Sequence, residues 1–205
     1  SYLANFVDTG AVADWAAEAT QICVKYGYVN GKTTNGGVIL DCDAIYHRLL
    51  QTDANLLLAI ENRFPGVVEN SMLQRKKLGN IVFRDEKALQ ELNFITHSAV
   101  RQEVLRRLPF PPTLVAIDAI GLFEGKLASL CDVTVAVTAP EDARVARLMA
   151  RDGISEEYAR KRIAAQHTED WFRERCDYVL VNDGDLDAFA TKCLAFLRQV
   201  AIMES

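Results

Sequence analysis

Residues 29–50 read VNGKTTNGGVILDCDAIYHRLL, and the second half of this stretch decides the fold class. VILDCD (38–43) is short, apolar and β-branched up to its two carboxylates, which is the pattern of a strand buried in a parallel sheet. AIYHRLLQ then begins a helix. A buried strand that passes directly into a helix is the repeating unit of α/β folds, so we expect that class here.

The rest of the chain repeats this alternation. Three further apolar runs predict strands, at TLVAIDA within 111–123, in 131–140 and in 176–183. Periodic segments predict helices at 52–66, 74–83, 85–108, 141–153, 155–166 and 185–201. The sequence therefore predicts an α/β architecture in which helices flank a parallel sheet.

Charge and composition narrow the class of protein. The chain has 205 residues, of which 50% are hydrophobic and 25% charged, enough for one core and a small extra lobe. Its formal net charge of -5 argues against a broad nucleic-acid interface. Five scattered cysteines without a CxxC pair argue against zinc and a disulfide framework, and favour a reducing cytoplasm. We expect no membrane span, since no apolar run approaches ~20 residues, and no signal peptide.

The GKTT stretch raises the question of a phosphate-binding loop. Such a loop has the form GxxxxGK[ST], follows a strand and opens a helix. The nearest match here runs from Gly27 to Thr33 and is one residue short. Residues 12–26 have helical spacing ahead of it, and only four residues separate Thr33 from Val38. We therefore favour a helix C-cap and turn over a working loop, with Lys32 and Thr33 as the candidates for contact with ATP.

Several motifs, taken together and in this order, resemble one family. They are DCDAIYHRLL, ITHSAVRQEV (95–104), IDAIGLFE and RLMARDGISEEYARKRIAAQ (147–166) followed by DYVLVNDGDL. From about Val38 to the C-terminus the chain resembles the dephospho-CoA kinases. The resemblance implies a P-loop kinase fold over 38–205, with a helical substrate region at about 50–108 and a lid at about 147–170.

The same resemblance implies an activity and its ligands. The family transfers the γ-phosphoryl group of ATP to the ribose 3′-hydroxyl of dephospho-CoA, with magnesium as cofactor. Dephospho-CoA and ATP are then the expected partners, and we assign no residue as a metal ligand. Nucleic acid and membranes are not expected partners.

Motif by motif, the resemblance also implies roles for single residues. Asp43 would orient or deprotonate the acceptor hydroxyl, with Asp41 as its neighbour on an extended strand, and Asp118 would share the catalytic role with Arg147. The expected acceptor contacts are Arg75, His97, Arg101 and Glu124, although Ser98 stands where the family usually has proline. The expected ATP contacts include Arg151 in the lid and Asn182 near the adenine.

Elementary chemistry supports these roles, but simpler interpretations exist. Phosphoryl transfer needs fixed guanidinium groups beside the phosphates and a carboxylate beside the acceptor hydroxyl. The carboxyl ends of parallel strands are where such groups collect. Alternatively, Asp41 and Asp43 cap the next helix, His97 is a helix-surface or core residue, and Trp171 is a packing group. We expect the remaining lid charges to be mostly solvated: Arg144, Arg160, Lys161 and Arg162.

The N-terminal segment differs from the rest of the chain. Residues 6–32, FVDTGAVADWAAEATQICVKYGYVNGK, are similar to part of an S-layer homology module. We interpret residues 1–37 as a segment that replaces the family's first strand, phosphate loop and first helix. Three functions follow as hypotheses: a kinase with an impaired ATP side, a non-catalytic protein that binds CoA-type nucleotides, or an interaction protein that docks through residues 1–37.

Overall fold

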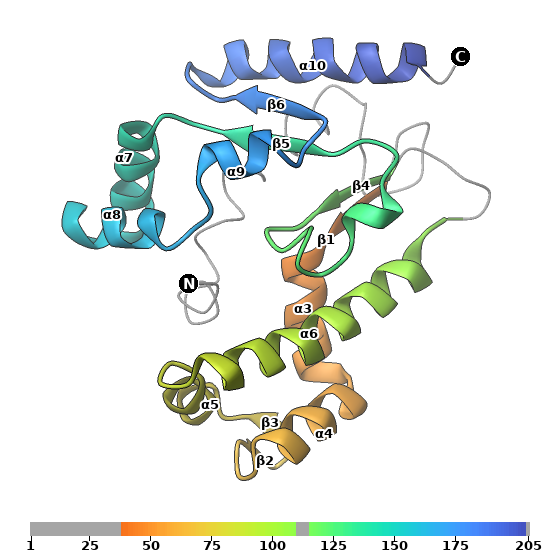
Figure 1. The fold of residues 1–205 in the computed structure, drawn as a ribbon, viewed down its shortest axis with the longest axis vertical. Coiled ribbons are helices and arrows are strands. Elements are labelled where there is room, and N and C mark those ends of the chain that lie inside the picture. The colour runs from red at the N-terminus through yellow and green to blue at the C-terminus, as the bar shows by residue number, and fades with distance from the viewer. Residues whose placement is uncertain (1–37, 110–114, 204–205) are drawn as a thin grey trace. The chain divides into compact units, whose positions relative to one another are not determined.

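The computed structural model describes residues 38–109 and 115–203 (Figure 1). These residues fall into two compact units, Val38–Cys131 and a second unit whose described part starts at Asp132. We describe each unit by itself. The predicted helix at 12–26, the S-layer-like segment and the GKTT stretch lie outside the described residues.

The first unit is built on one pair of parallel strands. β1 (Val38–Asp41) pairs with β4 (Val115–Asp118), and the register places Val38 opposite Val115 and Asp41 opposite Asp118. Both strands were predicted from their apolar, β-branched sequences, and both predictions are confirmed. The carboxyl ends of the two strands therefore finish side by side, each with an aspartate.

The described residues of the first unit also form a 3-10 turn, η1 (Ala128–Leu130), and four α-helices: α3 (Cys42–Thr52), α4 (Ala54–Arg63), α5 (Arg75–Val82) and α6 (Glu86–Arg107). Their predicted positions are confirmed to within a few residues. The long helix α6 packs against α3, α4 and α5, so it is the centre of this helical group (Figure 1). Leu92 and Val104 on α6 are fully buried there. Asp53 and Asp85 start α4 and α6 as N-caps, because their carboxylates accept backbone N–H groups of the first turn.

A small hairpin between α4 and α5 was not predicted. β2 (Val68–Glu69) and β3 (Met72–Leu73) pair antiparallel around Asn70 and Ser71, whose φ values are 51° and 60°. A tight hairpin turn needs such left-handed residues, and glycine usually supplies them. This turn lacks glycine, and its strands are two residues long, so the sequence carried little signal for it.

The second unit has its own parallel pair. β5 (Val135–Thr138) pairs with β6 (Tyr178–Val181), and α10 (Leu186–Met203) packs along β6. The core under α10 contains Phe189, Ala190 and Cys193, with Val137 and Leu180 from the strands. Together with the first unit, these parallel strands and flanking helices confirm the predicted α/β class.

A helical hairpin projects from the second unit. α7 (Glu141–Asp152) and α8 (Glu156–Ala164) pack through Val145, Ala159 and Ile163. Gly153 ends α7 with a φ of 63°, a left-handed conformation that glycine adopts without strain. The short helix α9 (Glu169–Arg173), which was not predicted, then leads back to β6. This hairpin forms most of the segment for which we predicted a lid.

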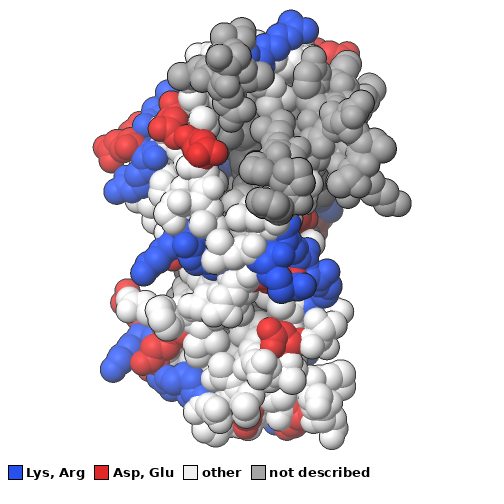
Figure 2. Space-filling model, turned by 90° about the vertical axis from the view of Figure 1, so that its right-hand side faces the viewer, with Lys and Arg blue, Asp and Glu red and all other residues white. Residues whose placement is uncertain are grey.

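The charged side chains of the described surface are mixed in sign. On the face in Figure 2, lysine and arginine (blue) alternate with aspartate and glutamate (red) over the described part. Many of them are paired, as Arg160 is with Glu141, Asp142 and Glu156 across the α7–α8 hairpin. None of the described helices combines the length and apolar character that crossing a lipid bilayer requires.

The packing of α6 gives a stability prediction. Leu92 is 0% exposed, whereas Leu58 on α4 is 58% exposed. Leu92→Ala removes buried apolar atoms and leaves a cavity, so we expect a loss of about 2–5 kcal/mol in the free energy of unfolding. Leu58→Ala is the matched control and should change it by less than about 0.5 kcal/mol. Urea unfolding followed by circular dichroism measures both, and equal effects would contradict the assigned core.

Candidate functional site

Three carboxylates gather where β1 and β4 end. Asp41 and Asp118 are the directly paired last residues of the two strands, and Asp43 lies in the first turn of α3. We call these three residues the carboxylate cluster. The prediction that Asp41 and Asp43 share the face of one extended strand is wrong, because the helix already begins at Cys42. The strand-to-helix junction keeps the two side chains close instead.

The two aspartates at this junction have different structural roles. The Asp41 carboxylate accepts a hydrogen bond from the backbone N–H of Ala44 at 2.8 Å, so Asp41 is the N-cap of α3. The capping alternative therefore holds for Asp41. Asp43 makes no such cap bond, and no side-chain hydrogen bond to it is found within the described residues. The Asp43 carboxylate therefore does not cap α3.

Electrostatics shows that the carboxylate cluster carries crowded negative charge. Burial, followed by repulsion from Asp41 and Asp43, raises the pKa of Asp118 to about 6. Burial and the charge of Asp41 also raise the pKa of Asp43. The thiol of Cys42, buried beside them, has its pKa raised to about 12, mainly by burial and then by Asp118. A cluster of this kind favours binding of a proton or of a group with positive charge.

The loop after β4 is held by α6. Arg101 donates from Nη1 to the backbone carbonyl of Lys126 at 2.6 Å. Burial lowers the pKa of His97, and the charge of Glu124 and a hydrogen bond with its backbone act in the opposite direction. The structure therefore brings the predicted residues His97, Arg101 and Glu124 together around one loop. In this structure Arg101 contacts the loop backbone, which makes it a support of the loop.

That loop is tightly folded. The backbone N–H of Gly125 bonds to the Gly121 carbonyl at 2.8 Å, and Leu127 bonds to Leu122 in the same way. A Cβ at Gly125 would lie 2.9 Å from the Gly121 oxygen, so a larger residue requires the loop to shift. Lys126 adopts a φ of 55°, which is uncommon for a residue other than glycine. The loop thus has a defined shape directly after Asp118.

Arg75 lies at the first position of α5, and its partner was not predicted. Its Nη2 atom lies 3.3 Å from Nδ1 of His47, one helical turn after Asp43 on α3. His47 is half-buried, and burial and the charge of Arg75 lower its pKa, whereas Asp41 opposes that shift. The only sequence signal for His47 is its spacing of four residues from Asp43, which places both on one side of a helix.

In the second unit, Arg147 and Asn182 contact each other. Nη2 of Arg147 lies 3.2 Å from the Asn182 side-chain oxygen and 3.5 Å from its backbone oxygen. Asn182 follows β6, is 4% exposed and donates its backbone N–H to Thr138 at 2.7 Å. Lys192 of α10 bonds to Asp183 and to the Val181 carbonyl. The end of β6 therefore fixes one nitrogen of the Arg147 guanidinium.

The end of α7 carries a paired cluster of charges. Arg151 donates through Nε and Nη2 to the two carboxylate oxygens of Asp152, at 2.6 and 2.9 Å. Arg162 donates to the same carboxylate at 2.7 Å and is only 6% exposed. The prediction that Arg162 is a solvated lid charge is therefore wrong, because an ion pair inside the α7–α8 hairpin compensates its burial. Of the residues predicted to contact ATP, Lys32 and Thr33 lie outside the described residues.

The chain matches known proteins over most of its length. A sequence model of the family described as dephospho-CoA kinase matches residues 29–188. The dephospho-CoA kinase of Latilactobacillus sakei is 31% identical over 186 residues, which cover 85% of this chain and 92% of that protein. The dephospho-CoA kinase of Geobacillus kaustophilus is 32% identical over 191 residues, covering 87% and 95% respectively.

Solved structures agree with this result. The crystal structure of a protein from Thermus thermophilus superposes with a TM-score of 0.68 at 31% sequence identity, covering 90% of this chain and 91% of that one. A dephospho-CoA kinase from Campylobacter jejuni gives a TM-score of 0.63 at 20% identity, covering 95% and 96%. Because its sequence identity is low, the Campylobacter jejuni structure supports only the fold of this chain.

The raised pKa of Asp118 predicts how stability depends on pH. An aspartate with a raised pKa binds its proton more tightly in the folded state, so its ionisation destabilises that state as the pH rises from about 4 through 6. We expect Asp118→Asn to increase the free energy of unfolding at pH 7 by about 1–3 kcal/mol. The gain should largely disappear at pH 4, where wild-type Asp118 is itself protonated. Urea unfolding at both pH values tests this, and a gain that is equal at both would contradict the shift.

Proposed function

Because the chain belongs to the dephospho-CoA kinase family, we propose that it binds dephospho-CoA and transfers the γ-phosphoryl group of ATP to its ribose 3′-hydroxyl. The observation that carries this proposal is the carboxylate cluster at the ends of β1 and β4. A carboxylate beside the acceptor hydroxyl is what phosphoryl transfer to an alcohol requires.

We assign the catalytic acid–base role to Asp43. Its carboxylate is not used as a helix cap, and burial beside Asp41 raises its pKa toward the working pH. A general base works best when its pKa lies near that pH, because it is then both ionised and able to take a proton. Asp41 fixes the start of α3, and therefore the place of Asp43. Asp118 adds negative charge that favours proton transfer from the hydroxyl to Asp43.

We assign the acceptor contacts to residues around this cluster. Arg75 offers a planar guanidinium to the phosphates of dephospho-CoA, because His47 takes up only one of its nitrogen atoms. His97, Arg101 and Glu124 shape the loop after β4, against which we place the nucleoside end of the substrate. All these residues belong to the first unit. We therefore propose that the chain keeps the family's binding site for dephospho-CoA.

We propose that the ATP side is impaired. A γ-phosphate is normally held by the amides of a GxxxxGK[ST] loop and by its lysine, and the stretch from Gly27 to Thr33 is one residue short of that spacing. Arg147 and Asn182 remain as candidate contacts. Arg151 has its charge neutralised by Asp152 and would have to exchange that partner for a phosphate.

Magnesium would reach such a site together with ATP. Within the described residues, no group of three or more Asp, Glu, His or Cys side chains is arranged to hold a metal ion by itself. Mg²⁺ in kinases is commonly held by one or two carboxylates together with substrate phosphates. The carboxylate cluster fits that smaller requirement, with Asp118 as the protein ligand, because Asp43 is assigned as the base. When bound, the ion would neutralise charge on the phosphates.

A non-catalytic protein that binds CoA-type nucleotides is the second candidate. The shortened GKT spacing favours it, because the loss falls on the ATP side and not on the carboxylate cluster. The two candidate functions predict different turnover, but both predict binding of dephospho-CoA.

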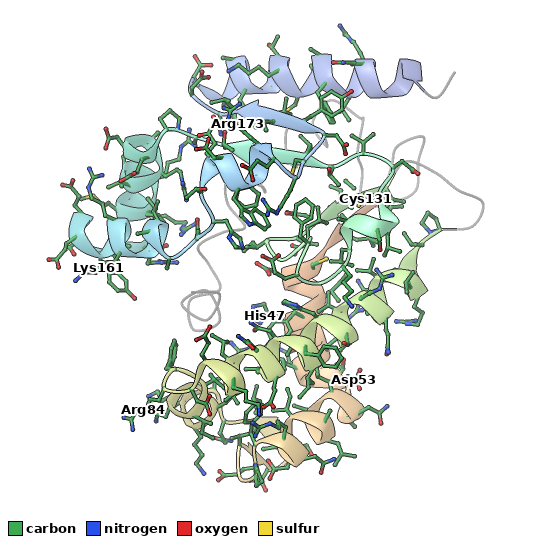
Figure 3. The ribbon with its side chains drawn as sticks, in the orientation of Figure 1. His47, Asp53, Arg84, Cys131, Lys161 and Arg173 are labelled. Carbon is green, nitrogen blue, oxygen red and sulfur yellow. The ribbon has the colours of Figure 1, made fainter. Side chains whose placement is uncertain are left out.

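The assignment of Asp43 predicts a loss of catalysis without a loss of binding. Removing a general base commonly costs 10²–10⁴-fold in rate, so Asp43→Asn should lower turnover of dephospho-CoA and ATP by at least about 100-fold. The matched control is Asp53→Asn, at the other end of α3 (Figure 3), because asparagine also serves as an N-cap. A coupled assay measures turnover and calorimetry measures binding. Equal turnover in the two variants would remove Asp43 from the mechanism.

The impaired ATP side makes a separate prediction. We expect dephospho-CoA to bind to the wild-type chain, whereas ATP with magnesium binds weakly, and we expect turnover below the ~1–100 s⁻¹ usual for kinases. Calorimetry with each ligand and the coupled assay test this. Turnover in the usual range would contradict the impairment, and binding without any turnover would favour the non-catalytic candidate.

A further inference from the structure

The first turn of α5 concentrates positive charge in an unfavourable place. Arg75, Lys76 and Lys77 follow one another there, with no acidic residue in that turn and no side-chain N-cap. The helix dipole makes this end positive, so cations there are destabilising unless an anion offsets them. Glu69 of the hairpin pairs with Lys77. The turn still carries a net positive charge beside His47.

His47 contacts this turn from α3 through a hydrogen bond with Arg75. Figure 3 shows it on α3, in the unit that contains the carboxylate cluster. Arginine can only donate hydrogen bonds, so His47 must accept at Nδ1 and hold its proton at Nε2. Burial and the charge of Arg75 both lower the pKa of His47, which agrees with a neutral ring.

The position of His47 links two parts of the proposed acceptor site. It follows Asp43 by four residues, so both side chains lie on the same side of α3. Through Nδ1 it also holds one nitrogen of Arg75, whose side chain is otherwise exposed. An exposed arginine loses conformational entropy when it binds a phosphate, and a preformed contact reduces that loss.

We propose that His47 is a positioning residue that directs the Arg75 guanidinium toward the diphosphate of dephospho-CoA. This inference rests on the proposed function and names the part of the substrate that the first turn of α5 contacts. Because His47 and Asp43 share one helix, the same contact sets the distance between the bound diphosphate and the base. His47 itself touches neither the hydroxyl nor the transferred phosphoryl group.

Calorimetry with two ligands and four variants tests the inference. The ligands are dephospho-CoA and adenosine, which lacks the diphosphate. The variants are His47→Leu, which removes the acceptor, His47→Asn, which keeps an acceptor near Nδ1, Arg75→Gln, and the double variant His47→Leu/Arg75→Gln. Circular dichroism confirms that each variant is folded, and His47→Asn covers the case in which His47→Leu does not fold.

We expect His47→Leu to weaken dephospho-CoA binding about tenfold, the size expected for a lost hydrogen bond to a charged group. His47→Asn should restore most of that affinity. The double variant should bind no more weakly than Arg75→Gln, because both changes act through one guanidinium. Adenosine should bind equally to all of them.

Each contrary result overturns a defined statement. If His47→Leu binds dephospho-CoA as tightly as the wild type, or if the effects of the two single changes multiply, His47 does not act through Arg75. If adenosine binding falls together with dephospho-CoA binding, the role of His47 is general and not directed at the diphosphate. If the wild-type chain does not bind dephospho-CoA, the proposed function fails, and this inference falls with it.

Discussion

The parallel pairing of β1 with β4 imposes a repulsion on which the candidate site depends. Backbone hydrogen bonds fix the register, and that register sets Asp41 directly against Asp118, with Asp43 in the first turn of α3. Isolated carboxylates would move apart in water. Here the strands hold them together in a buried place, and burial, followed by their mutual repulsion, raises the pKa values of Asp118 and Asp43. Pairs of groups strained in this way are frequent at functional sites, because a ligand or a proton relieves the repulsion.

Helix α6 supports this arrangement from one side. Its buried face carries Leu92 and Val104, and the same helix holds the loop after β4 through Arg101. Near its C-terminal end, the buried carboxylate of Glu103 accepts hydrogen bonds from Arg48 of α3 and from Arg106 and Arg107 of its own helix. The contact with Arg48, at 2.5 Å, ties α3 to α6. The helix that carries Asp43 is therefore fixed by ion pairing as well as by apolar packing.

The parts of this structure that sequence reasoning anticipated share a local origin. The strand β1 is an apolar β-branched run that ends in acids, and α7 and α8 have helical spacing with Gly153 between them, so each could be predicted from neighbours in the chain. The features that the sequence did not predict are either very short elements or contacts between residues far apart in the chain. The β2–β3 hairpin turns without glycine, α9 has only five residues, and the pairing of Arg162 with Asp152 depends on how two helices pack. Sequence reasoning placed a candidate site residue correctly where that residue ends a strand, as Asp118 ends β4.

The sequence by itself determined the α/β class, the alternation of elements, and the acids that end two strands, because backbone preferences and side-chain periodicity act over a few neighbouring residues. Only the tertiary structure decided which of these residues meet. It placed Asp41 against Asp118 across 77 positions of the chain, made Asp41 a cap while leaving Asp43 free, and brought His47 to Arg75. Those contacts depend on strand register and on the packing of α3 beside the β2–β3 hairpin. Neither is encoded in the spacing of residues along the chain.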